Sequence, residues 1–440
     1  MCKISVIMPV FNAEEYVGIA LDSLLKQSFN DMEIICVDDG STDRSLEILH
    51  QYQKKDERIN VLQQANKYAG VARNLGMSVA QGKYLSFLDA DDYFRPDMLQ
   101  KAYECAEEER ADVVVFGGEQ FRGDINNLEP FSALLREDML PSTAKNGFEN
   151  EIKMENIMNF TNPAPWNKLF RRDFILKQHL QFQDYKRFND AYFVVMALVL
   201  AQKIGIVHEN LICYRTGNGN SLQGSNDEVP TQFADVFSDI QNKLVELNLY
   251  EQVEKSFRRI SLSTCIYTLE SLRNIDAFEK LYLRLQRELF GKFNIIGSEK
   301  SDYYNIHAYD QYLYICSHTP MEYLMDKLQN RAEQETQYLF PYSQIEKNSR
   351  IMLYGAGKVG RAFYHQIKKT QYCHIEAWVD KKERMYDGYT IYKPEEADWE
   401  KCEKIVIAIE KESVAKVIEN TLIDEYHVAK EKIVWESPVL

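Results

Sequence analysis

Three carboxylates stand close together, directly after an apolar run, in the segment Lys83–Asp97, KYLSFLDADDYFRPD. The run from Tyr84 to Leu88 reads as a buried strand, and an extended strand end places Asp89 and Asp91 on the same side. Paired carboxylate oxygens suit Mg²⁺ or Mn²⁺, which complete their coordination with phosphate oxygens and water. The alternative is that these aspartates form a turn and cap a helix that starts near Pro96.

Residues that could contact a ligand also lie at the ends of two earlier predicted strands. They are Pro9, Val10, Phe11 and Asn12 after the first strand, and Asp38 and Asp39 of the segment DDGSTD after the second. In an open parallel sheet, ligands bind beyond the carboxyl ends of the strands, because loops and helix N-termini converge there. The sequence therefore predicts a ligand site at this edge of the sheet.

The elements that must position these residues alternate between strand and helix over the first ~100 residues, which predicts a parallel sheet covered by helices. Later segments predict one further helix and one further strand, at DAYFVVMALVLA and KIGIVHENLICYR. The expected early strands are KISVIMPVF, MEIICVDDG, INVLQQ, KYLSFLDADD and ADVVVFGG. The expected early helices are 14–27, one from Ser41, 71–80 and 96–109.

Several of these segments occur in an order that resembles the family 2 glycosyltransferases with the GT-A fold. The segments are VIMPVFNAEEYV, IICVDDGSTDRS, AGVARNLGMSVAQGKYLSFLDADDYF, PAPWNKLFRRDFI, NDAYF and ICYRTGNGNSL. The resemblance covers residues 3–223, about half of the chain. It implies direct displacement, with inversion at the anomeric carbon, of a nucleoside diphosphate by an acceptor hydroxyl.

The resemblance also implies roles for individual residues on the donor side. Asp89 and Asp91 become a DxD motif that holds Mn²⁺ or Mg²⁺ against the donor diphosphate. A carboxylate suits uracil, whose ring N–H is a donor, so a UDP-sugar is the expected donor. For Arg73 the alternative is a surface ion pair on its own helix. The implied nucleotide-binding residues are Pro9, Val10, Phe11, Asn12, Asp38, Asp39, Arg73, Asn74, Asp89 and Ala90.

On the acceptor side, Asp190 is the implied general base. The family has a Glu-Asp pair there, whereas this chain has Asn189 before Asp190, and Asp190 could instead only cap a helix. Arg215 and the following TGNGNSL would form a lid over the diphosphate. Trp166, Asn167 and Lys168 would line the sugar and acceptor pocket, although Trp166 could equally anchor the core.

The C-terminal part carries a second motif. Gly355, Gly357 and Gly360 form G-x-G-x-x-G between a predicted strand and a predicted helix, and Asp380 ends the next strand. This pattern predicts a small Rossmann-like domain that binds NAD or another nucleotide. The alternative is that the glycines only permit tight packing in a module that binds nothing.

The chain of 440 residues exceeds what one hydrophobic core usually organises. The fold class is therefore predicted as α/β with three parts: a GT-A domain at 1–225, a helical region at 226–345 and a Rossmann-like domain at 346–440. A formal net charge of −15 argues against nucleic acid as a partner. The apolar runs are all shorter than the ~20 residues of a membrane span.

Eight scattered cysteines without a CxxC pair fit a reducing cytosol. The sequence thus predicts a cytoplasmic location. It leaves open whether the chain contacts the inner membrane face and whether it forms a homo-oligomer.

The leading hypothesis is a metal-dependent, hexosyltransferase-type enzyme of bacterial surface polysaccharide synthesis, with a glycan or lipid-linked oligosaccharide as acceptor. One alternative is a subunit without activity that binds a nucleotide or glycan and partners an active transferase. Another is an NAD-dependent oxidoreductase, suggested by GAGKVG. The aspartate-rich, glycine-poor ends of the early strands oppose it.

Overall fold

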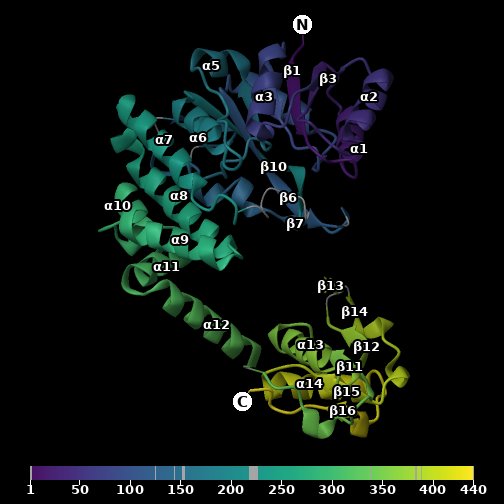
Figure 1. Ribbon diagram of the computed structural model, residues 1–440. Helices are drawn as coiled ribbons and strands as arrows, with labels where there is room; N and C mark the ends of the chain where they lie inside the picture. The colour runs from purple at the N-terminus through teal and green to yellow at the C-terminus, as the bar shows by residue number, and fades with distance from the viewer. Residues whose placement is uncertain are drawn as a thin grey trace. The chain divides into compact units, whose positions relative to one another are not determined.

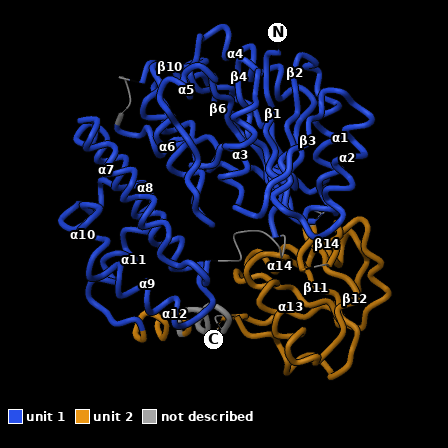
Figure 2. The backbone as a smooth tube through the Cα atoms, turned by 45° about the horizontal axis from the view of Figure 1, so that its top comes forward, with its two compact units in different colours: residues 1–320 blue, residues 321–440 orange. Residues whose placement is uncertain are grey.

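A computed structural model describes residues 2–123, 125–142, 144–150, 154–217, 226–336, 338–381, 384–387 and 389–439. The chain forms two compact units, residues 1–320 and 321–440 (Figure 2). The predicted boundary after residue 225 lies inside the first unit. The helices that follow this boundary therefore pack with the predicted GT-A domain as one body.

The first unit is built on a ten-stranded sheet with the order β3-β2-β1-β4-β9-β6-β10-β5, to which β7 and β8 add at β6 and β10 (Figure 1). The pairs β1–β2, β2–β3 and β1–β4 are parallel, as predicted for the first part of the chain. Strand β9 runs antiparallel between β4 and β6. The strands are β1 (Ile4–Val10), β2 (Met32–Asp38), β3 (Ile59–Gln63), β4 (Tyr84–Phe87), β5 (Tyr93–Phe94), β6 (Val113–Arg122), β7 (Glu129–Pro130), β8 (Gly147–Glu149), β9 (Lys168–Arg171) and β10 (Lys203–Thr216).

Helices cover both faces of this sheet because side chains alternate along each strand. On β1, Val6 and Met8 join the core that contains α1, α2 and α4, whereas Ile7 lies against α3 at Gly76. Helix α6 packs through Phe193 on the β4 and β9 side. The helices are α1 (Val17–Leu25), α2 (Ser45–Lys55), α3 (Tyr68–Val79), α4 (Met98–Glu108), α5 (Arg172–Lys177) and α6 (Ala191–Leu200), with short 3₁₀ helices η1 (Ser132–Leu134), η2 (Glu137–Met139) and η4 (Met154–Asn156).

A helical region completes the first unit. Phe237, Phe257 and Phe293 form an aromatic cluster at its centre, with ring centroids 5.8–6.2 Å apart. The predicted helical region in the middle of the chain is thus confirmed. The elements are α7 (Gln232–Glu246), α8 (Tyr250–Ser271), α9 (Ile275–Arg284), η6 (Leu285–Leu289), α10 (Phe290–Lys292), η7 (Lys300–Asp302) and α11 (Ile306–Ser317).

The second unit is a smaller α/β body with a sheet of order β13-β14-β12-β11-β15-β16, in which only β13 is antiparallel. Helices α13 and α14 pack on opposite faces of the sheet. Its elements are α12 (Pro320–Thr336), η8 (Tyr342–Gln344), β11 (Arg350–Tyr354), α13 (Lys358–Thr370), β12 (His374–Val379), β13 (Arg384–Tyr386), β14 (Tyr389–Tyr392), η9 (Pro394–Glu396), η10 (Trp399–Lys401), β15 (Lys404–Ile407), α14 (Glu412–Asp424), η11 (Lys430–Lys432) and β16 (Ile433–Val434).

The three glycines of the G-x-G-x-x-G motif differ in the structural reason for glycine at each position. Gly355 has a φ of +106°, and a Cβ on Gly360 would lie 1.9 Å from the Gly355 carbonyl oxygen. A Cβ on Gly357 would meet no atom of the described residues within 4 Å. Backbone conformation and packing therefore explain Gly355 and Gly360 but leave Gly357 unexplained.

Hydropathy adds one observation on membranes. Within the described ranges, no helix is both long enough and apolar enough to cross a membrane.

We expect Gly360→Ala to destabilise the second unit by about 1–3 kcal/mol, because its Cβ would overlap backbone that cannot move freely. Gly357→Ala is the matched control and should have a smaller effect. Urea unfolding followed by tryptophan fluorescence measures this, because Trp378, Trp399 and Trp435, three of the four tryptophans, lie in the second unit. Equal unfolding midpoints for the two variants would contradict the packing role of Gly360.

Candidate active site

The loops after β1 and β2 are bonded to each other at the carboxyl edge of the sheet. Asn12 has a φ of 47°, its backbone N–H donates to Ser41 Oγ at 3.1 Å, and its Oδ1 accepts from the Thr42 N–H at 2.8 Å. Pro9 and Val10 belong to β1, and the neighbouring Phe11 is 47% exposed. Asn12 thus shapes the loop, while Phe11 offers an open aromatic face.

Asp38 and Asp39 are both buried but differ in their contacts. Asp39 Oδ1 accepts from Gln64 Nε2 at 2.7 Å and from the Lys67 N–H at 2.8 Å, so it holds the segment between β3 and α3. Asp38 Oδ1 has no hydrogen-bond partner among the described residues, although it is buried. Asp38 Oδ1 is thus a buried carboxylate oxygen that is left for a ligand.

Arg73 joins the end of β4 to the loop before α6. Its Nη2 lies 2.7 Å from Asp89 Oδ1, and its Nη1 donates to Asn189 Oδ1 at 3.1 Å. The Arg73 side chain is only 6% exposed, whereas Asp89 keeps 29% exposure, so a buried guanidinium reaches across the site to a partly exposed carboxylate. The alternative of a surface ion pair on its own helix is therefore wrong.

Asn74, the other predicted residue of this helix, holds the same loop in place. Its side chain exchanges two hydrogen bonds with the backbone of Phe182, at 2.8 and 2.9 Å. It therefore positions the segment that leads to Asp190.

The carboxylates after β4 crowd one another. Asp92 is buried, and burial together with the charges of Asp91 and Asp89 raises its pKa well above the ordinary value. Asp89 and Asp91 keep partial exposure on either side of the buried Ala90. Helix α4 starts only at Met98, so these aspartates do not cap it.

Arg215 fixes this carboxylate loop from β10. Its backbone N–H donates to Asp92 Oδ1 at 3.0 Å, and its Nε donates to the Asp91 carbonyl at 2.9 Å. The guanidinium lies over the rings of Tyr16 and Phe121, 4.7 and 4.5 Å from their centroids. The part of the predicted lid at 218–222 lies outside the described residues.

The carboxylate oxygens at this edge of the sheet are suited to bind a divalent cation. Carboxylate oxygens are the preferred ligands of Mg²⁺ and Mn²⁺. Burial first and then the charges of Asp91 and Asp89 raise the pKa of Asp92, and a cation would relieve the repulsion between these charges. In the described part of the chain, no group of three or more His, Cys, Asp or Glu side chains is arranged as a closed metal cage. An ion here would therefore need ligands from a substrate or water.

Asp190 stands at the N-cap position of α6, but in the described structure its side chain makes no capping hydrogen bond. The packing of Phe193, one turn later, against Phe87 at 5.4 Å brings this helix end over the end of β4. Burial raises the pKa of Asp190, Arg73 and Lys168 oppose the shift, and Asp89 adds to it. The Asp190 carboxylate thus does not cap the helix, and its raised pKa suits it to accept a proton.

Trp166, Asn167 and Lys168 lie deeper than predicted. Trp166 is 5% exposed and stacks on Tyr214 with centroids 4.9 Å apart, whereas Asn167 and Lys168 are fully buried. Direct contact of these residues with a sugar stays a prediction. Their burial favours a role in positioning. Trp166 is part of the hydrophobic core, which agrees with the alternative that it anchors the core.

The Lys168 ammonium is enclosed by oxygen atoms. Burial lowers its pKa, and the Asp190 carboxylate opposes that shift. Its Nζ lies 2.7–3.0 Å from four oxygens: Thr161 Oγ1, the carbonyls of Asn162 and Ala164, and Asn167 Oδ1. Because the Thr161 hydroxyl donates to Leu134, the amine is surrounded by acceptors for its three N–H donors, which suits its charged form.

Tyr214 is a site residue that sequence reasoning missed. Burial raises its pKa, and the charges of Asp92, Asp89 and Asp91 add to the shift, so it lies close to the carboxylate loop. It stacks between Trp166 and Phe131. Its place directly before Arg215 was the one signal that the sequence offered.

In the second unit, Asp380 Oδ2 accepts from the Ala356 N–H at 2.6 Å, and the Gly355 carbonyl accepts from Trp378 Nε1. Asp380 therefore supports the glycine loop. The open space at Gly357 leaves the start of α13 accessible. Binding of NAD or another nucleotide there stays a prediction.

Comparisons with known proteins agree with this geometry. Residues 5–177 match the model of the family described as glycosyl transferase family 2. The chain is 34% identical to the glycosyltransferase EpsJ of Bacillus subtilis, over 50% of this chain and 62% of EpsJ. It is 32% identical to the glycosyltransferase GlyG of Streptococcus pneumoniae, over 50% of this chain and 73% of GlyG.

The fold has a counterpart among solved structures. Residues 1–349 of TarS from S. aureus, in complex with UDP-GlcNAc, give a TM-score of 0.50 at 22% identity over 70% of this chain and 90% of that one. This likeness confirms the predicted α/β GT-A fold. The family model and the match to GlyG show that the chain belongs to glycosyltransferase family 2.

Proposed function

We propose that this chain transfers a sugar from a nucleoside diphosphate donor to a hydroxyl of a glycan acceptor, with inversion at the anomeric carbon. The observation that carries the proposal is the convergence, through Arg73, of the carboxylates after β4 and the Asp190 loop. One group of side chains thus serves the leaving diphosphate and the other serves the attacking hydroxyl.

The donor is proposed to be a UDP-sugar. Asp38 Oδ1 is a buried acceptor without a protein partner among the described residues, which fits the ring N–H of uracil. Phe11 lies exposed at the same strand edge and could cover a base or ribose. Cytosine carries an acceptor at the corresponding ring position and would face the carboxylate unfavourably.

Asp91 and Asp89 are the residues proposed to hold Mn²⁺ or Mg²⁺. A bound divalent ion would supply charge neutralisation for the departing diphosphate. Arg73 keeps Asp89 in place, and Arg215 keeps the backbone of Asp91 in place, before any ligand arrives. These two contacts define the anionic end of the site.

Asp190 is proposed to take the proton of the acceptor hydroxyl as the new bond forms between that oxygen and the anomeric carbon. The bond from the anomeric carbon to the diphosphate oxygen breaks, and its electron pair leaves with the nucleoside diphosphate. The raised pKa makes Asp190 a stronger base than an exposed aspartate. Arg73 and Lys168 limit this rise in the pKa of Asp190.

The biological setting proposed is the synthesis of a bacterial surface polysaccharide, in the cytoplasm or at the inner membrane face. The acceptor would be a glycan or a lipid-linked oligosaccharide. The alternative is a binding subunit without activity that partners an active transferase. Asp190 separates the two readings, because a binding subunit has no use for a general base.

Asp190→Asn should lower kcat by about 10²–10⁴-fold while leaving the affinity for UDP unchanged, because the amide keeps the shape but cannot accept the proton. Turnover with a panel of UDP-sugars and acceptors, together with calorimetric titration of UDP, measures both quantities. Asp184→Asn, at an exposed aspartate of the same loop, is the matched control. Equal turnover for Asp190→Asn and wild type would contradict the catalytic proposal.

The pH profile of kcat/KM should show an acid limb above the ordinary pKa of aspartate. Asp190 must be ionised to act, and its raised pKa means that activity is lost as the pH falls through that higher value. Initial rates are measured across pH 4–8 at saturating donor and varied acceptor, which gives kcat/KM for the acceptor. Circular dichroism checks that the protein stays folded. A rate that stays constant until the protein unfolds at acid pH would exclude Asp190 as the base.

A further inference from the structure

Helix α8 makes a buried contact with the segment that leads into the active site. Ser256 is fully buried, and its Oγ accepts from the Met158 N–H at 2.9 Å and donates to Asn159 Oδ1 at 2.8 Å. Asn159 Nδ2 donates in return to the Ser256 carbonyl at 3.2 Å. The two residues are 97 positions apart in the sequence, and α8 lies outside the residues that match the family model.

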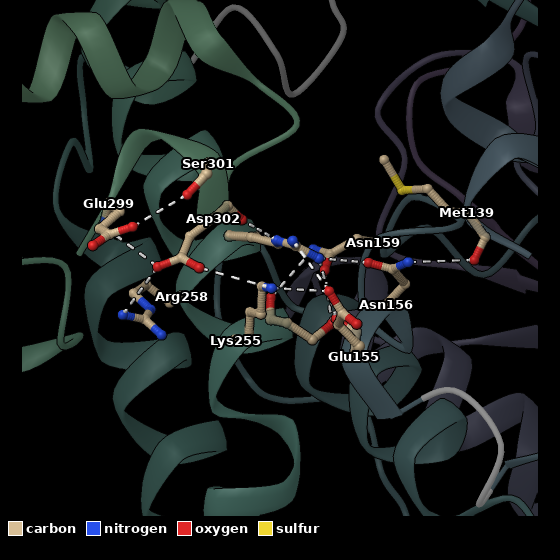
Figure 3. A network of polar contacts seen from close by, with 11 residues as sticks. Met139, Glu155, Asn156, Asn159, Lys255, Arg258, Glu299, Ser301 and Asp302 are labelled. Carbon is tan, nitrogen blue, oxygen red and sulfur yellow. Dashed lines mark hydrogen bonds and ion pairs between the residues drawn. The ribbon is translucent and has the colours of Figure 1, made fainter.

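A network of charged and polar side chains surrounds this contact (Figure 3). Lys255 Nζ lies 3.0 Å from Glu155 Oε1 and 3.7 Å from Asp302 Oδ1. Arg259 Nη1 donates to Asn156 Oδ1 at 2.6 Å. Lys255, Ser256 and Arg259, all within about one turn of α8, therefore bind the segment around η4.

The segment that α8 contacts, residues 155–159, leads directly to the oxygen atoms around Lys168. Arg136 Nη1 donates to the Asn159 carbonyl at 2.6 Å, and two residues later Thr161 is also buried. Thr161 Oγ1 accepts from Lys168 Nζ at 3.0 Å. The path from Ser256 to Lys168 thus runs through Asn159 and Thr161, all of them buried.

We propose that Ser256 and Asn159 are positioning residues, through which the helical region sets the loop that holds the Lys168 ammonium near Asp190. The role rests on the proposed function, since it concerns the same base. Neither residue touches the reacting atoms. The helical region then acts in catalysis by fixing the shape of the loop at 158–168.

The direct test compares two serines of the same helix. Ser256→Ala removes two hydrogen bonds to the loop and should lower kcat at least about tenfold, because small misplacements of catalytic groups reduce rates strongly. Ser261→Ala is the matched control, since Ser261 is equally buried but its Oγ has no hydrogen-bond partner within the described part of the chain. The affinity for UDP should stay unchanged in both variants.

A second readout separates positioning from general loss of stability. If Lys168 moves away from Asp190 in Ser256→Ala, the acid limb of kcat/KM should shift to higher pH, because a charge that lowers the Asp190 pKa is lost. The other charged groups that act on Asp190 are Arg73, Arg187 and Asp89, and the substitution leaves them in place. Ser256→Thr keeps the hydroxyl, so its kcat and the acid limb of its kcat/KM profile should match those of the wild type.

Two outcomes would overturn the proposal. One is a folded Ser256→Ala variant with the turnover and pH profile of Ser261→Ala. The other is unchanged hydrogen exchange of the amides in 158–168 when the two variants are compared. If Ser256→Ala does not fold, Ser256→Cys provides the same comparison, because it keeps the size with a weaker hydrogen bond.

Hydrogen exchange also keeps the positioning role separate from the proposed function. If the wild-type chain transfers no sugar, the proposed function fails. Faster exchange of 158–168 in Ser256→Ala than in Ser261→Ala would still support the contact.

Discussion

The Arg73 guanidinium lies buried between Asp89, at the end of β4, and Asn189, directly before Asp190. A buried charge is tolerated only while its partners stay in place, because an uncompensated buried charge is strongly destabilising. The strand end and the start of α6 are therefore held at a fixed separation. In the proposed function, this separation places the carboxylates that would serve the leaving group and the carboxylate that would act as base together before any substrate binds.

The carboxylates after β4 impose a second constraint. Arg73 balances one of them, and the Arg215 N–H supports Asp92, but the charges still raise the pKa of Asp92. In the proposed reaction, this excess of negative charge would repel a free diphosphate. A cation held by Asp91 would reverse the local charge, so that donor binding and metal binding depend on each other.

The sequence predicted the strands and helices that follow from local patterns. It did not predict the hydrogen bonds and burial that depend on contacts between distant segments. Strand periodicity predicted the parallel strands and the carboxylates after β4, and the family resemblance pointed to Asp190 at the start of the helix α6. They did not reveal that Asn12 and Asn74 bond to the backbone of other loops, or that Lys168 is buried. The Ser256 contact was likewise invisible, because a side-chain hydrogen bond across 97 positions leaves no periodic pattern.

The central claim is that the carboxylates after β4 hold the donor diphosphate through a divalent cation. Thermal unfolding with UDP and Mn²⁺, each alone and both together, tests it directly, because ligands that bind the folded state raise its stability. The account predicts that UDP raises the Tm only when Mn²⁺ is present, that Asp91→Ala abolishes this shift, and that Asp97→Ala, outside the carboxylate cluster, retains it. An equal UDP shift without metal, or in Asp91→Ala, would contradict the account.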